Sequence, residues 1–178
     1  MFCLQIDEQL SLGLFEKRHA KELAELIDSS RSYLREWLPW VDYSTSIEDS
    51  EQFIRLSLEQ FARNDGFQLA IRYKGKIAGI IGLHAINWSN RSTSIGYWLG
   101  EGFQGNGLMT KACEAVVAYC FEELGLHRIE IRAAEGNEKS QAIPQRLGFR
   151  KEGCIRESEW LYDHFVDHHV YGLLKKDY

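Results

Sequence analysis

The sequence predicts an α/β (α+β) domain in which helices flank a mixed, mostly antiparallel sheet, and two observations predict this fold. Three alternating segments joined by short turns between residues 67 and 99 indicate an antiparallel meander. A helical pattern over residues 108–124 then precedes another alternating segment. That segment must return by a crossover and lie parallel to the strand before the helix. The length of 178 residues suits a single domain spanning residues 1–178.

Composition narrows the class of protein. Hydrophobic residues make up 44% and charged residues 26%, as in ordinary globular domains. The formal net charge is −5 and no block of Lys or Arg occurs, which argues against a nucleic-acid partner. No apolar run has the length of a membrane span, and no signal peptide is recognisable, so no membrane partner is expected. The cysteines fit no zinc pattern and are expected to be reduced thiols of a cytoplasmic protein: Cys3, Cys113, Cys120 and Cys154.

The amino-terminal part reads as one strand followed by helices. Residues 3–15 are predicted to form a strand that Gly13 interrupts, and residues 17–29 a helix with one apolar face. A second short helical segment ends at Pro39, because proline cannot continue a helix. Three aromatic residues near it indicate either core packing, a subunit contact in a homo-oligomer, or the wall of a ligand pocket: Trp37, Trp40 and Tyr43.

The next segment contains one helix and the meander. Thr45 with Glu48 three residues later predicts a capping box and a helix to about Asn64. The buried stripe of this helix is predicted to be Ile47, Ile54, Leu58 and Phe61. Lys74-Gly75 is predicted as a two-residue hairpin turn. The meander strands are expected at residues 67–73, 76–85 and 92–99.

The carboxy-terminal half alternates helices and strands. The helix at residues 108–124 has a predicted buried face that includes Tyr119. Asn137 is the expected N-cap of a later, shorter helix. Within that helix Pro144 has no N–H for the carbonyl of Ser140, so a kink or bulge is predicted directly after Ser140. The remaining elements are a helix at residues 137–147 and strands at residues 128–133, 150–161 and 165–174.

A glycine-rich turn separates the last meander strand from the helix at residues 108–124. Its glycines permit close approach of a ligand, and the helix that follows has free N–H groups at the positive end of its dipole, an arrangement that binds phosphate. Gly100-x-Gly102-x-x-Gly105 is literally the dinucleotide fingerprint. However, the fingerprint belongs to a parallel sheet, and this turn follows an antiparallel meander, so a nicotinamide or flavin cofactor is disfavoured.

The same turn contains Gln104-x-x-Gly107-x-Met109, which resembles the acetyl-CoA signature of the GNAT superfamily of N-acetyltransferases. Met109 departs from the small residue that is usual at the last position. The resemblance runs from Leu12 to Tyr171 and favours the ribosomal-protein N-acetyltransferase (RimJ/RimL-type) branch. The segments that carry it are GYWLGEGFQGNGLMTKA, GLHRIEIRAAEGNEKS, LGFRKEGCIRE and DHHVYGLL. It implies a GNAT fold splayed around an acetyl-CoA slot.

Simple chemistry agrees with acetyl-CoA as the co-substrate. Successive backbone N–H groups from Gln104 to Thr110 can cradle its pyrophosphate without basic side chains. Its peptide-like pantetheine arm can pair with a free strand edge near Trp98 and Leu99. No metal is expected, because acid–base groups suffice for the transfer. The expected cofactor-binding residues are Trp98, Leu99, Gln104, Gly105, Asn106, Gly107, Leu108, Met109, Thr110 and Asn137.

Acetyl transfer to an amine needs a base for the ammonium group and an acid for the leaving thiolate. Asn137-x-x-Ser140 resembles the family pattern in which the Asn binds pantetheine and the Ser protonates the thiolate; taken alone, it would be a helix cap. The resemblance assigns the water-mediated base to Glu159. Glu157 lies two residues earlier in the same strand, so its side chain is expected on the same face, and it stays the alternative base. The other interpretation is that both carboxylates are solvated charges at the edge of the sheet. His84 is a further alternative base.

The resemblance implies direct acetyl transfer to a primary amine, namely the N-terminal α-amine of a ribosomal protein. Acetylation of a small amine, such as a polyamine, an amino acid or an antibiotic, stays open as an alternative. A non-catalytic acyl-CoA-binding module is the alternative from another class of protein. Such a module needs neither Ser140 nor Glu159, and both are present.

Overall fold

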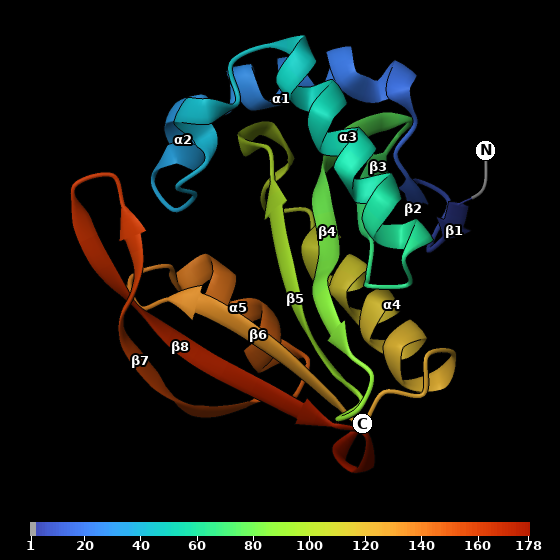
Figure 1. Ribbon diagram of the computed structural model, residues 1–178, viewed down its shortest axis with the longest axis vertical. Coiled ribbons are helices and arrows are strands. Elements are labelled where there is room, and N and C mark those ends of the chain that lie inside the picture. Colours follow the sequence, from blue (N-terminus) through green and yellow to red (C-terminus); the bar gives the residue numbers. More distant parts are fainter. Residues whose placement is uncertain (1–2) are drawn as a thin grey trace.

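A computed structural model describes residues 3–178 and confirms a mixed, mostly antiparallel α/β fold (Figure 1). Eight strands form one sheet in the order β1-β2-β3-β4-β5-β6-β8-β7. The strands are β1 (Cys3–Gln5), β2 (Leu10–Leu14), β3 (Gln68–Tyr73), β4 (Lys76–Asn87), β5 (Ser92–Leu99), β6 (Arg128–Ala134), β7 (Arg150–Leu161) and β8 (His164–Leu174). The α-helices are α1 (Ala20–Ser29), α2 (Arg31–Arg35), α3 (Ile47–Ala62), α4 (Leu108–Glu122) and α5 (Glu138–Arg146).

Helices cover both faces of the sheet (Figure 1), and strand alternation decides which face each apolar side chain meets. On β3, Ala70 packs with the core cluster formed by α1 and α3, whereas its neighbour Ile71 packs with the cluster that contains α4. On β4, Ile80 and Ile81 divide in the same way. The central strand β4 is therefore buried on both faces, which explains why its residues from Ile77 to Leu83 are all apolar or glycine.

The sheet opens in its middle, as the sequence predicts. Residues 92–95 of β5 pair in parallel with residues 128–131 of β6. Beyond this point β5 stays with β4 as far as Leu99, whereas β6 stays with β8 as far as Ala134. The two strands diverge and leave a V-shaped gap between the halves of the sheet (Figure 1). The mouth of this gap carries the site described below.

The prediction of one strand over residues 3–15 is wrong, because this segment folds back on itself as β1 and β2. Asp7 accepts hydrogen bonds from the backbone N–H groups of Gln9 and Leu10, each at 2.9 Å. A short acidic side chain that bonds to its own backbone in this way reverses the chain direction. The turn therefore lies at Asp7, ahead of Gly13.

The capping box of α3 lies one residue later than predicted. Ser46 is the N-cap, and its hydroxyl accepts from the N–H of Asp49, whose carboxylate accepts from the N–H of Ser46. Thr45 and Glu48 do not form the predicted pair. The predicted stripe of α3 is also wrong apart from Ile54, because three of its members are exposed: Ile47, Leu58 and Phe61. On α4, Tyr119 is likewise 40% exposed, against prediction.

Candidate active site

The amino-terminal end of α5 is built around Ser140. Asn137 is the N-cap, and its Oδ1 accepts from the N–H of Ser140 at 3.1 Å. The helix runs through Pro144 to Arg146, and the kink or bulge expected after Ser140 stays a prediction. The carbonyl that Pro144 cannot satisfy accepts instead from the hydroxyl of Tyr97 on β5, at 2.9 Å. A missing helical bond thereby becomes a contact between α5 and the sheet.

Tyr97 is suited to this contact because its phenol stays protonated. Burial, with the neighbouring Cys113 second, raises the pKa of Tyr97. Cys113 and Cys120 are free and buried, as expected, and burial raises the pKa of Cys120 to about 12. Burial also raises the pKa of Cys113. These thiols are therefore neutral packing groups of α4.

Two cavities meet beside Ser140. The larger has a volume of about 980 Å³ and lies between the helices α1 to α3 and the open part of the sheet. The smaller has a volume of about 100 Å³ and lies between α2, the end of β5, the start of α4 and α5. Both are lined by the same residues at their junction: Trp37, Leu38, Tyr97, Trp98 and Ser140. A substrate held in one cavity can therefore meet a substrate held in the other at Ser140.

The smaller cavity contains several of the residues predicted to bind acetyl-CoA. Trp98, Leu99, Gln104 and Met109 line it. Gln104 also donates from Nε2 to the carbonyl of Leu99 at 3.3 Å, which fixes its side chain beside the cavity. Asn137 lines neither cavity, so its contact with pantetheine stays a prediction.

The glycine-rich turn presents the start of α4. Gly105 and Gly107 have φ values of +77° and +69°, in the left-handed region that glycine adopts without strain. Gly107 is the N-cap of α4, and no side chain in residues 3–178 caps this helix. The first N–H groups of an α-helix have no partner within the helix. These N–H groups therefore have no helical partner, and the binding of a phosphate by Leu108, Met109 and Thr110 stays a prediction.

The end of β5 has a free edge that faces the gap in the sheet. The N–H of Gly100 donates to the carbonyl of Ala78 on β4, at 2.8 Å. Because backbone groups alternate sides along a strand, those of Trp98 also face β4, and those of Tyr97 and Leu99 face the gap. Leu99 therefore has the geometry for the predicted pairing with a peptide-like arm, whereas Trp98 contributes its side chain.

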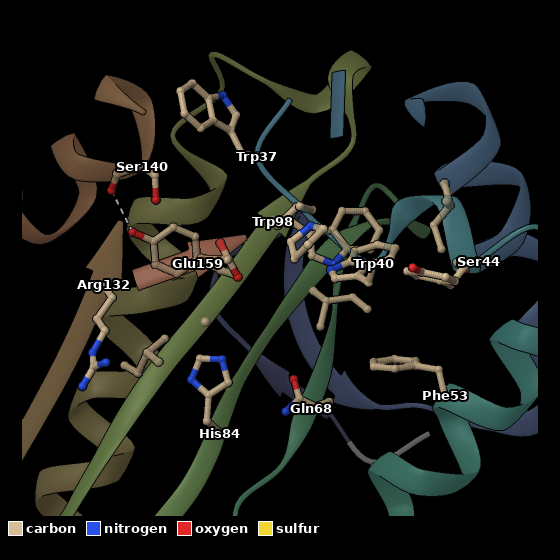
Figure 2. A pocket seen from close by; sticks show the side chains of 18 of the residues that line it. Trp37, Trp40, Ser44, Phe53, Gln68, His84, Trp98, Arg132, Ser140 and Glu159 are labelled. Carbon is tan, nitrogen blue, oxygen red and sulfur yellow. Dashed lines mark hydrogen bonds between the residues drawn. The ribbon is translucent and has the colours of Figure 1, made fainter. Parts of the chain in front are cut away.

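Only one of the two predicted carboxylates lies in the larger cavity. Glu159 lines it (Figure 2). Its Oε2 lies 3.3 Å from Nε2 of His168 on β8. Glu157 is exposed, has a φ of +49° and donates its N–H to the carboxylate of Asp167. The pairing of β7 with β8 shifts register between Ile155 and Glu159, so the parity argument that placed both carboxylates on one face fails.

Aromatic residues in the segment between α2 and α3 form a wall of the larger cavity. Trp37, Trp40 and Tyr43 all line it, which agrees with the ligand-pocket interpretation. Trp40 lies against Trp98 of β5 with ring centroids 5.8 Å apart (Figure 2). The wall therefore joins the helical layer to the open strand.

The floor of the larger cavity contains polar residues that the sequence reasoning did not select, apart from the alternative base His84. Arg132 and Gln68 line it with His84 (Figure 2), and Ser94 also lines it. Nδ1 of His84 lies 2.9 Å from Oγ of Ser94, and desolvation, with the Arg132 charge second, lowers the pKa of His84. A side chain on Gly96 would put its Cβ 2.7 Å from the His84 ring. The alternation of side chains along β6 could have indicated that Arg132 faces away from the core residues next to it in that strand.

Neither a metal cluster nor a membrane helix occurs in the part of the chain that the structure describes. No group of three or more His, Cys, Asp or Glu side chains in residues 3–178 could hold a metal ion. Of the helices in the same residues, none is long and apolar enough to cross a membrane.

Comparison with known proteins identifies the family. The acetyltransferase (GNAT) domain matches residues 9–150. The putative ribosomal N-acetyltransferase YdaF of Bacillus subtilis is 37% identical over 100% of this chain and 98% of its own. The microcin self-immunity acetyltransferase MccE, solved with acetyl-CoA and AMP, is 30% identical with a TM-score of 0.92, covering 96% of this chain and 95% of that one. RimL, a ribosomal alpha-N-protein acetyltransferase solved with coenzyme A, is 26% identical with a TM-score of 0.93, covering 97% and 98%. The chain therefore belongs to the GNAT family and is an acetyl-CoA-dependent N-acetyltransferase.

Proposed function

We propose that this N-acetyltransferase acetylates the N-terminal α-amine of a protein, with a ribosomal protein as the acceptor. The junction of a narrow cavity and a wide one at Ser140 carries the proposal. The narrow cavity suits the thin pantetheine arm, and the wide one has room for the end of a peptide chain. The similarity to RimL, a ribosomal alpha-N-protein acetyltransferase, supports this acceptor class.

In the proposed mechanism acetyl-CoA binds first and the acetyl group is transferred directly. Glu159 accepts a proton from the acceptor ammonium through a water molecule, which leaves a neutral amine. The amine nitrogen attacks the thioester carbonyl carbon and forms a tetrahedral intermediate. The C–S bond then breaks, and the Ser140 hydroxyl protonates the departing thiolate. The nitrogen gives its second proton to water, so that a neutral amide remains on the acceptor. Ser140 and Glu159 return to their initial protonation states by exchange with solvent.

Two substitutions test the assigned roles. Glu159→Gln keeps the shape of the side chain but removes the base, so we expect kcat at neutral pH to fall by about 10²-fold or more. Ser140→Ala removes the proton donor, and we expect a loss that falls mainly on kcat rather than on the KM for acetyl-CoA. Glu157→Gln is the matched control, because Glu157 is an exposed carboxylate on the same strand. Unchanged turnover in the Glu159→Gln, Ser140→Ala double variant would refute the mechanism.

The acceptor requires a separate experiment. Purified protein is incubated with acetyl-CoA and ribosomes or cell extract, and intact-mass and peptide spectra locate each added acetyl group. We expect specific labelling of a protein N-terminus. Labelling of small amines alone would contradict the proposed acceptor and would favour a polyamine, amino acid or antibiotic.

A further inference from the structure

The floor of the larger cavity has a positive end opposite the proposed base. Of the described residues that line this cavity, Arg132 is the only Arg or Lys. Glu159 marks the other end, where the ammonium group of the acceptor would lose its proton. An acceptor that spans the floor therefore meets charges of opposite sign at its two ends.

Neighbouring side chains hold Arg132 in place. Its Nε donates to Glu130 at 2.6 Å, and no other hydrogen bond to Arg132 is formed within residues 3–178. Glu130 also accepts from Arg128 at 3.1 Å, and Arg128 is paired with Glu152. Glu130 is thus shared between two guanidinium groups, and the two terminal nitrogens of Arg132 keep donors for a ligand.

His84 and Ser94 complete this part of the floor. β4, β5 and β6 are neighbours in the sheet, and the parallel pairing of β5 with β6 ends one residue before Arg132. His84 and Ser94 are hydrogen-bonded to each other across β4 and β5, and both line the cavity with Arg132. Gly96 leaves the space that the imidazole ring occupies. Three adjacent strands therefore direct nitrogen and hydroxyl donors into one region.

We propose that Arg132, with His84 and Ser94, forms a subsite that binds an acidic side chain close to the acetylated N-terminus of the acceptor. This inference rests on the proposed function and names the acceptor more narrowly. A guanidinium group with two free terminal nitrogens matches the two oxygens of a carboxylate. The chemical class of the ligand is accordingly a carboxylate.

The sheet geometry sets the position of that acidic residue. Arg132 and Ala134 both line the cavity from β6, and Ala134 pairs with His168, whose Nε2 touches Glu159. Two residues along a strand and one strand across correspond to roughly 8 Å. An extended peptide covers about 3.3–3.6 Å per residue, so the carboxylate belongs to the second or third residue of the acceptor.

The test compares kcat/KM for a neutral peptide amide with that for its counterparts carrying Asp at the second or third position. We expect the native enzyme to favour an acidic peptide by about tenfold. In Arg132→Gln the ratio of kcat/KM for the acidic peptide to that for the neutral peptide should fall to near one, and the change should lie in KM. Arg132→Lys should restore part of this ratio. Arg55→Gln, on the outer helix α3, is the matched control and should keep the native ratio. Thermal unfolding of each variant shows whether it is folded.

Other outcomes overturn the inference or separate it from the proposed function. Equal ratios in the native enzyme and in Arg132→Gln would overturn it. If no peptide is acetylated but small amines are, the proposed function fails. The subsite is then read from 6-aminohexanoate against 6-aminohexanol, because the extended acid holds its carboxylate at about the required distance from its amine: a preference for the acid that Arg132→Gln removes supports the subsite, and no preference overturns it.

Discussion

The contact between Tyr97 and the Ser140 carbonyl gives the most specific prediction about stability. Pro144 deprives that carbonyl of its helical partner, and the Tyr97 hydroxyl replaces it at 2.9 Å. Tyr97→Phe leaves the carbonyl without a partner, which costs about 2 kcal/mol in the free energy of unfolding. For a chain of this length we expect Tm to fall by about 4–8 °C.

Pro144→Ala reveals whether the proline is the reason for the contact. Alanine has an N–H that can donate to the Ser140 carbonyl within α5, so the carbonyl keeps a partner when Tyr97 is replaced. In that background we expect Tyr97→Phe to cost only about 0.5–1 kcal/mol, which corresponds to a coupling energy of about 1 kcal/mol. The sign of the coupling follows from the geometry, whatever Pro144→Ala does alone.

Urea unfolding of the four proteins of this cycle measures the coupling. Tyr162→Phe is the matched control, because the Tyr162 hydroxyl also donates to a carbonyl, that of Leu38, far from Pro144 in the chain. Its cost should be the same with proline or alanine at position 144. If Tyr97→Phe costs the same in both backgrounds, the reasoning from Pro144 is refuted.

Two further predictions concern buried polar groups. Oε1 of Gln141 accepts from the Tyr171 hydroxyl at 2.9 Å and from His169 Nδ1 at 2.8 Å. Gln141→Leu removes this shared acceptor, so the free energy of unfolding should fall by about 3 kcal/mol. A loss below about 1 kcal/mol in a urea titration would contradict this expectation. The pKa of His84 in the folded protein lies below its unfolded value of about 6.5. The stability that neutral His84 contributes is therefore fully present above that pH. It is lost as the pH falls through the folded-state pKa. Between pH 8 and pH 5 the free energy of unfolding should fall less steeply in His84→Gln than in the native protein. The same slope in both proteins would exclude this role of His84.

The local parts of the fold could be predicted because short signals determine them. Lys74 and Gly75 have φ values of +51° and +81°, as a two-residue turn of this kind requires. The crossover after β5 fixed the parallel pairing with β6. The buried face of α3 could not be predicted in the same way. Packing against α1 selects the face with Ser50 and Ser57, and the Ser57 hydroxyl is satisfied by the Phe53 carbonyl at 2.8 Å.

The site divides along similar lines. Ser140 and Glu159 were selected by their position in recognisable segments, and the structure brings both to the larger cavity. The floor formed by His84, Ser94 and Arg132 depends on the register of three strands, which no short segment encodes. The register shift in β7 is equally invisible in the sequence, and it is why Glu157 was expected beside Glu159.

The early end of the β5–β6 pairing gives the sheet an edge in its interior instead of at its border. Backbone groups at such an edge exchange hydrogen with solvent more readily than paired ones. We predict that the pantetheine arm of the coenzyme pairs with this edge at Leu99 and so protects it from solvent in the loaded enzyme. Exchange at the amides of Tyr97 and Leu99 therefore reports coenzyme occupancy, and its slowing should accompany the rise in Tm that ligand binding produces.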